Sequence, residues 1–122
     1  MTASGVLIVT TDALAGALLG AAVEFAGCVP VFPREGESAR DALRRSRPCA
    51  VLVDCDSEDA CGESFLGPAI MVGASIGIFT STRSRRALEP IAKEYDVRVF
   101  DLPIAFDDLK ALLDTCARKT ST

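Results

Sequence analysis

The stretch PCAVLVD, residues 48–54, decides the fold of this 122-residue chain. Its centre, residues 50–53, is apolar throughout, and an uninterrupted apolar run of this length predicts a strand that is buried on both faces. Three further strands are predicted at residues 6–9, 76–79 and 97–100. A fifth strand at residues 29–32 contains a proline, which places it near a sheet edge because proline donates no backbone hydrogen bond.

Helical patterns alternate with these strands. Thr11 or Asp12 is placed to cap a helix over residues 13–25, and Gly27 is placed to end it. The other predicted helices cover residues 37–45, 64–72, 84–94 and 106–117. Because apolar strands need helices on both faces, we predict an α/β fold of (βα)5 type, with a doubly wound, five-stranded parallel sheet. In such folds the functional residues gather at the carboxyl ends of the strands.

The composition is that of one packed domain, which we expect over residues 1–118 with a short tail at 119–122. Hydrophobic residues make up 49%, and 13 Lys and Arg against 17 Asp and Glu give a net charge of −4. This mild acidity argues against binding of nucleic acid by this chain, since phosphate contacts need a basic face. The sequence contains no histidine, which excludes Ser-His-Asp and Cys-His catalysis and any phosphohistidine relay within the chain.

Cysteine usage and hydropathy favour a location in the cytoplasm. The five cysteines are an odd number without a C-x-x-C pair, so we expect buried or half-buried reduced thiols. Residues 65–80 carry no charge, but they include Pro68 and are shorter than the ~20 apolar residues that a membrane span needs. We therefore predict no membrane insertion.

The strand ends carry a resemblance to a known family. Over nearly its whole length the sequence resembles the receiver domains of bacterial response regulators, the output partners in two-component signal transduction. Residues 48–54 resemble the stretch that leads to the phosphoacceptor aspartate, here Asp54, and residues 78–81 resemble the strand that ends in the switch threonine, here Thr80. Residues 102–113 resemble the fifth loop and the last helix. The resemblance implies a flavodoxin-like fold with strand order 2-1-3-4-5.

The family's phosphorylation pocket is incomplete in this sequence. Receivers bind Mg²⁺ through an acidic pair after the first strand, at the positions of Thr10 and Thr11, and neutralise the phosphoryl group with a lysine at the position of Leu102. Hydroxyl groups are poor ligands for a hard divalent ion, and leucine supplies no charge. We expect no metal, no cofactor and no catalytic residue. The degenerate pocket comprises Thr10, Thr11, Asp12, Asp54, Thr80, Leu102 and Pro103.

Two interpretations of Asp54 and Thr80 remain open at this stage. In one, Asp54 accepts a phosphoryl group and Thr80 is its switch partner, with Asp12, Asp54 and Asp56 holding a metal ion. In the other, Asp54 is a structural or helix-capping carboxylate and Thr80 is a strand-end hydroxyl. The acidic loop at residues 54–59 lacks the register of a calcium-binding loop, which favours a solvated loop before a helix.

Residues 80–86 combine hydroxyl and guanidinium groups at the predicted start of a helix. This combination is typical of a site for a phosphate, a nucleotide or an acidic protein surface, and equally of a solvated helix start. The residues of this possible anion site are Thr80, Ser81, Thr82, Arg83, Arg85 and Arg86.

A second basic face is predicted on the helix at residues 37–45. We interpret it as mostly solvated, with Asp41 and Arg45 spaced to form an ion pair. Its basic residues are Arg40, Arg44, Arg45 and Arg47.

The sequence favours a pseudo-receiver, which is a protein-interaction module in signalling that works without phosphorylation. Its expected partner is a protein, and a homodimer is possible through its helical faces. One alternative is an atypical receiver that is phosphorylated on Asp54, and another is a sensor of a small anionic ligand or nucleotide that uses residues 80–86. An enzyme is not expected, because the chain has no glycine-rich phosphate loop after its first strand and no activated nucleophile.

Overall fold

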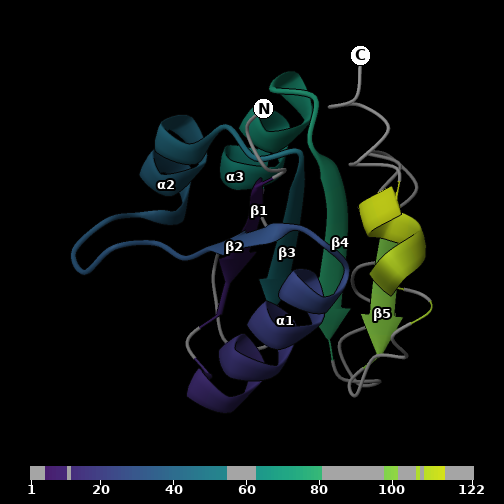
Figure 1. Ribbon diagram of the computed structural model, residues 1–122. Helices are drawn as coiled ribbons and strands as arrows, with labels where there is room; N and C mark the ends of the chain where they lie inside the picture. Colours follow the sequence, from purple (N-terminus) through teal and green to yellow (C-terminus); the bar gives the residue numbers. More distant parts are fainter. Residues whose placement is uncertain are drawn as a thin grey trace.

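The computed structural model describes residues 5–10, 12–54, 63–80, 98–101, 107 and 109–114 (Figure 1). Residue 107 and residues 109–114 are helical, in agreement with the helix predicted at 106–117. The helix predicted at 84–94 lies outside the described residues. The other elements are β1 (Gly5–Val9), α1 (Ala13–Phe25), β2 (Val29–Val31), α2 (Ala39–Ser46), β3 (Ala50–Asp54), α3 (Glu63–Met71), β4 (Ser75–Thr80) and β5 (Arg98–Asp101).

The strands form a parallel sheet in the order β2-β1-β3-β4-β5, which confirms the predicted fold. Strand β1 pairs with β3 in a register that sets Val9 beside Val53, and β3 pairs with β4 so that Asp54 stands beside Phe79. The proline-containing strand β2 lies at the edge, as its sequence predicts. The carboxyl ends of β1, β3 and β4 therefore meet at one end of the sheet.

The sheet is covered on both faces, and alternate residues of β1 show this directly. Leu7 and Val9 belong to a buried cluster that includes Leu43 of α2 and Ala69 of α3. Val6 and Ile8 belong to a second cluster on the other face. Helix α1 contributes Leu19 and Val23 to it, and the C-terminal helical residues contribute Leu109, Leu112 and Leu113. Helices α2 and α3 thus share one face, where Figure 1 shows them beside each other.

Side-chain caps decide where two of the helices begin. Asp12 is the N-cap of α1, as one of the two predicted candidates, and its Oδ1 accepts the backbone N–H groups of Leu14 and Ala15 at 3.0 and 3.2 Å. Helix α2 begins after Ser38, whose Oγ accepts the Asp41 N–H at 3.1 Å, so the predicted start at residue 37 is wrong by two positions. Arg47 ends α2 with φ of 42°, a left-handed conformation that usually favours glycine.

Two cysteines lie among the described residues, and they differ. Cys28 is a free, buried thiol, and burial, followed by the nearby charge of Asp114, raises its pKa. Cys49 is disulfide-bonded, which corrects the expectation that the cysteines are reduced. Its Sγ lies 3.3 Å from the carbonyl oxygen of Gly5. In the part of the chain that the structure describes, no helix is long and apolar enough to cross a membrane.

Candidate functional site at the carboxyl ends of the strands

The parallel pairing of β1 and β3 brings Thr10 beside Asp54. Both residues follow the paired Val9 and Val53, so the same register carries over to them. Asp54 is only 5% exposed and is the buried charged residue of the described core. A carboxylate at this depth needs hydrogen-bond donors, because burial without them costs several kcal/mol.

The Thr10 hydroxyl is one of these donors. Its Oγ1 donates to Oδ2 of Asp54 at 2.9 Å, and the same Oγ1 accepts the backbone N–H of Asp12 at 3.1 Å. The hydroxyl therefore links the loop between β1 and α1 to the end of β3. Thr10 occupies the place where the family resemblance calls for a metal-binding carboxylate, and there it serves as a neutral partner of Asp54.

Asp12 lies in the same loop, but its side chain caps helix α1. Its side chain is exposed, and its Oδ1 is held by two backbone N–H groups at the start of α1. In the described ranges no cluster of three His, Cys, Asp or Glu side chains is arranged to hold a metal ion. Asp56, the third member of the alternative metal site, lies outside those ranges.

Thr80 is the last residue of β4, where its backbone pairs with that of Asp101. It stands one residue beyond Phe79, the partner of Asp54, so its backbone lies at the same end of the sheet as Asp54. Thr11, Leu102 and Pro103 lie outside the described residues, as do residues 81–86 of the possible anion site. The structure thus brings together Thr10, Asp12 and Asp54 from the predicted set.

The packing of an aromatic ring against α1 is a feature that the sequence analysis did not predict. The ring of Phe32 lies against two glycines of α1. An ideal Cβ on Gly20 would stand 3.2 Å from Cζ of Phe32, and one on Gly16 would stand 3.4 Å from Cγ2 of Thr10 and 3.7 Å from Cε1 of Phe32. The i, i+4 spacing of the two glycines is the sequence signal that indicates a close approach to this face of α1.

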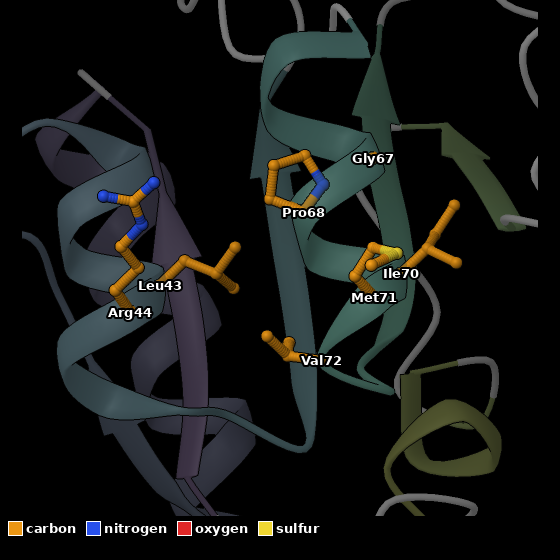
Figure 2. A pocket seen from close by; sticks show the side chains of 7 residues that line it. All are labelled: Leu43, Arg44, Gly67, Pro68, Ile70, Met71 and Val72. Atoms are coloured by element: carbon orange, nitrogen blue, oxygen red, sulfur yellow. The ribbon is translucent and has the colours of Figure 1, made fainter.

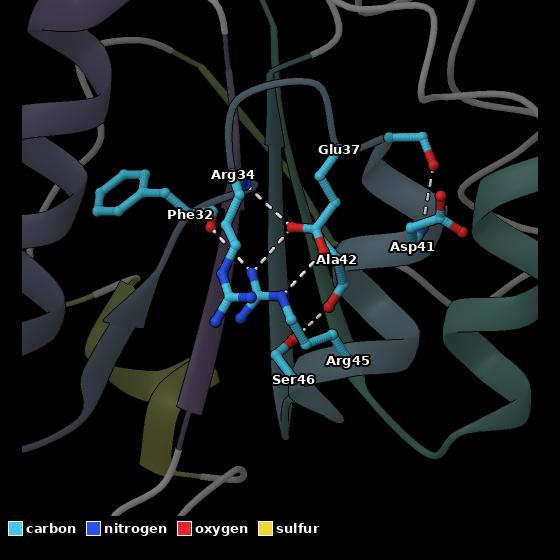
Figure 3. Close-up of polar contacts among 8 residues, drawn as sticks. Phe32, Arg34, Glu37, Asp41, Ala42, Arg45 and Ser46 are labelled. Carbon is cyan, nitrogen blue, oxygen red and sulfur yellow. Dashed lines mark hydrogen bonds and ion pairs between the residues drawn. The ribbon is translucent and has the colours of Figure 1, made fainter.

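The predicted pair of Asp41 and Arg45 is wrong, because Arg45 binds Glu37 instead (Figure 3). Its Nε donates to Oε2 of Glu37 and its Nη2 donates to Oε1, both at 2.9 Å, while Nη2 also reaches the carbonyl oxygen of Phe32 at 3.3 Å. The Arg34 backbone N–H adds a bond to Oε1 at 2.9 Å. These contacts lower the pKa of Glu37 to about 2, with the Arg45 side chain as the largest cause. They hold the loop after β2 onto α2.

Several solved structures with this fold are receiver domains. A response regulator receiver domain protein from Clostridium thermocellum superposes with a TM-score of 0.75 at 14% identity, covering 97% of each chain. The signal receiver domain of a putative LuxO repressor protein from Vibrio parahaemolyticus gives 0.75 at 22% identity, covering 97% of this chain and 92% of that one. The signal receiver domain of a modulated diguanylate cyclase from Desulfovibrio desulfuricans G20 gives 0.72 at 27% identity, covering 97% and 96%.

No protein-family model matches the sequence, and no curated protein matches it either. From the superpositions, the chain has the receiver fold, and they cover nearly its whole length.

Proposed function

We propose that this chain is a pseudo-receiver, a receiver-fold module that binds a protein partner without phosphoryl transfer to Asp54. The observation that carries the proposal is the 2.9 Å hydrogen bond from Thr10 Oγ1 to Asp54 Oδ2. Transfer of a phosphoryl group to a carboxylate requires a divalent cation that neutralises the transferring oxygens. The cation requires carboxylate ligands beside the acceptor, and a threonine hydroxyl stands there instead.

The position of Asp12 supports the same conclusion. It is the acidic residue of the loop after β1, and its Oδ1 is engaged by the first turn of α1. Recruiting this carboxylate to a metal would remove the cap of α1, which costs about 1 kcal/mol in typical helices. At the far side of the pocket, the sequence places Leu102 where a receiver has its phosphate-binding lysine.

Phosphorylation is tested with acetyl phosphate and Mg²⁺, followed by intact-protein mass spectrometry at neutral pH. We expect no gain of about 80 Da, the mass of one phosphoryl group, in the unmodified chain. The matched control restores the receiver residues through Thr10→Asp, Thr11→Asp and Leu102→Lys together, and it is expected to gain the phosphoryl group. A Mg²⁺-dependent gain in the unmodified chain that disappears in Asp54→Asn would establish the alternative, an atypical phosphorylated receiver.

The sensor hypothesis rests on residues 80–86 and is tested separately. A ligand at 100 times its Kd stabilises a folded protein by ~2.7 kcal/mol, which a thermal shift detects readily. The screen uses inorganic phosphate, nucleoside phosphates and cyclic dinucleotides. We expect no shift, and a saturable shift that is lost in Arg83→Ala would favour the sensor over the interaction module.

A further inference from the structure

An apolar groove lies between α2 and α3, on the sheet face away from α1. It has a volume of about 600 Å³ (Figure 2). Leu43 and Arg44 line it from α2, and Gly67, Pro68 and residues 70–72 line it from α3 and the turn that follows. Figure 2 shows Leu43 pointing from α2 toward α3, with Pro68, Met71 and Val72 on the opposite wall.

The wall on the α3 side exposes apolar side chains to solvent. Met71 is 87% exposed, and its neighbours Ile70 and Val72 are 37% and 47% exposed. Gly67 adds no side chain to this wall, and a Cβ at that position would point into open space, with nothing within 4 Å beyond its chain neighbours and nearby helix backbone. A contiguous apolar patch of this kind, bordered by charge, is typical of a protein-binding surface.

The border on the α2 side is basic. Arg44 lines the groove, Arg40 stands one helical turn before it on α2, and Arg47 follows at the C-cap; all three are exposed. The fourth arginine, Arg45, is bound to Glu37, and this is the ion pair found within the described ranges. Asp41 is the single acidic residue of α2, so this edge of the groove carries excess positive charge.

We propose that this groove docks an amphipathic helix of a protein partner, with apolar residues on the groove floor and acidic residues facing the arginines of α2. The lengths agree with this occupant. Helices of 8 and 9 residues are each roughly 12–14 Å long, which accommodates about two turns of a third helix. Two turns present apolar side chains at i, i+3 or i+4, and i+7, the pattern by which helices bind grooves.

Charge distinguishes this partner from a second copy of the chain. In a symmetric dimer the same patch meets itself, so a second copy brings the same excess of positive charge to the interface. Like charges in a desolvated interface are unfavourable, whereas acidic flanks on a partner helix are complementary to this edge. The inference does not depend on Asp54, since the groove lies on residues that the strand-end pocket does not use.

The test uses three labelled peptides of about 18 residues that share one apolar ridge and carry Glu, Gln or Lys on the flanks. Binding is followed by fluorescence anisotropy and by amide chemical shifts in ¹⁵N-labelled protein. We expect saturable binding of the Glu peptide with shifts at α2 and α3, and affinity at least about tenfold lower for the Lys peptide. Raising NaCl from about 50 to about 500 mM weakens the Glu peptide, because salt screens exposed charges.

Variants locate the contact. Met71→Asp is expected to abolish binding without unfolding the domain, because this side chain is largely exposed. The matched control is Leu14→Asp, which changes a leucine that is 69% exposed on α1 and leaves binding unchanged. Arg40→Glu, Arg44→Glu and Arg47→Glu together should reverse the preference toward the Lys peptide.

Several results would overturn the proposal. They are the absence of saturable binding by the Glu peptide, equal binding of all three peptides, shifts centred on α1, and retention of binding in Met71→Asp. Sedimentation of the free chain as a dimer that Met71→Asp converts to a monomer would assign the groove to a second copy instead. None of these results bears on whether Asp54 is phosphorylated, so this inference and the proposed function fail independently.

Discussion

The strand-end pocket and the α2–α3 groove differ in whether their side chains are bonded within the chain or exposed to solvent. At the strand ends the polar groups are satisfied within the chain, since Thr10 donates to Asp54 and Asp12 caps α1. In the groove, apolar side chains such as Met71 and the charge of Arg44 face solvent. Although the polar groups at the strand ends are bonded within the chain, the α2–α3 groove leaves apolar and basic groups exposed for a partner to bind.

The largest expected effect is on the free energy of unfolding, and it distinguishes a substitution in the floor of the groove from one at its rim. Leu43 is fully buried beneath the groove, so Leu43→Ala should lower the free energy of unfolding by about 2–5 kcal/mol through lost packing and a cavity. Met71→Ala, at the exposed rim, should change it by no more than about 0.5 kcal/mol. Urea denaturation measures both variants. Equal losses would mean that the rim residues belong to the core.

A middle-sized effect tests whether the Thr10 hydroxyl supports Asp54. Thr10→Val keeps the shape of the side chain and removes one donor to a buried carboxylate, which should cost about 1–3 kcal/mol. Thr10→Ser retains the donor and should recover most of that loss. Both are compared by denaturant unfolding at neutral pH. A harmless Thr10→Val would show that the hydrogen bond contributes nothing to the fold.

These two regions also show what the sequence does and does not predict. The parallel sheet with helices on both faces follows from the apolar runs, whereas the strand order is implied by the resemblance to receiver domains. Once β1 pairs with β3, their parallel register sets Thr10 beside Asp54. The partner of Arg45 was mispredicted because helical spacing favours Asp41, whereas the loop after β2 returns Glu37 to the same guanidinium. The groove depends on how α2 and α3 sit on the sheet, and no spacing within one helix encodes that placement.

A smaller effect on stability tests whether the groove wall is open at Gly67. Gly67→Ala adds a methyl group that meets nothing within 4 Å beyond its chain neighbours and nearby helix backbone. It should stabilise α3 by at most about 0.5–1 kcal/mol, because alanine favours helix while the ring of the following Pro68 crowds the new Cβ. The control Gly20→Ala places its Cβ 3.2 Å from the Phe32 ring, so packing should cancel or reverse the gain. Thermal unfolding compares the two variants. A loss of stability in Gly67→Ala would show that the groove wall is closed at that position.

The smallest effect concerns the loop clamp of Glu37 and Arg45. The folded-state pKa of Glu37 is lowered from 4.5 to about 2, so the stability that it contributes is present above pH 4.5 and is lost as the pH falls toward 2. The ion pair lies at the surface and is partly exposed, which keeps the effect small. Unfolding midpoints of the unmodified chain and of Glu37→Gln should differ at pH 6 and converge near about pH 2. A difference that grows at low pH would reverse the assigned sign.

The most direct test of the central claim is an NMR titration of the ¹⁵N-labelled chain with Mg²⁺ and beryllium fluoride, a mimic of an aspartyl phosphate. The account predicts no saturable shift of the Thr10, Asp12 and Asp54 amides at millimolar Mg²⁺, because a hydroxyl and a helix cap stand where metal ligands would be needed. Saturable shifts confined to these three strand-end residues would contradict it and would show a working phosphorylation pocket.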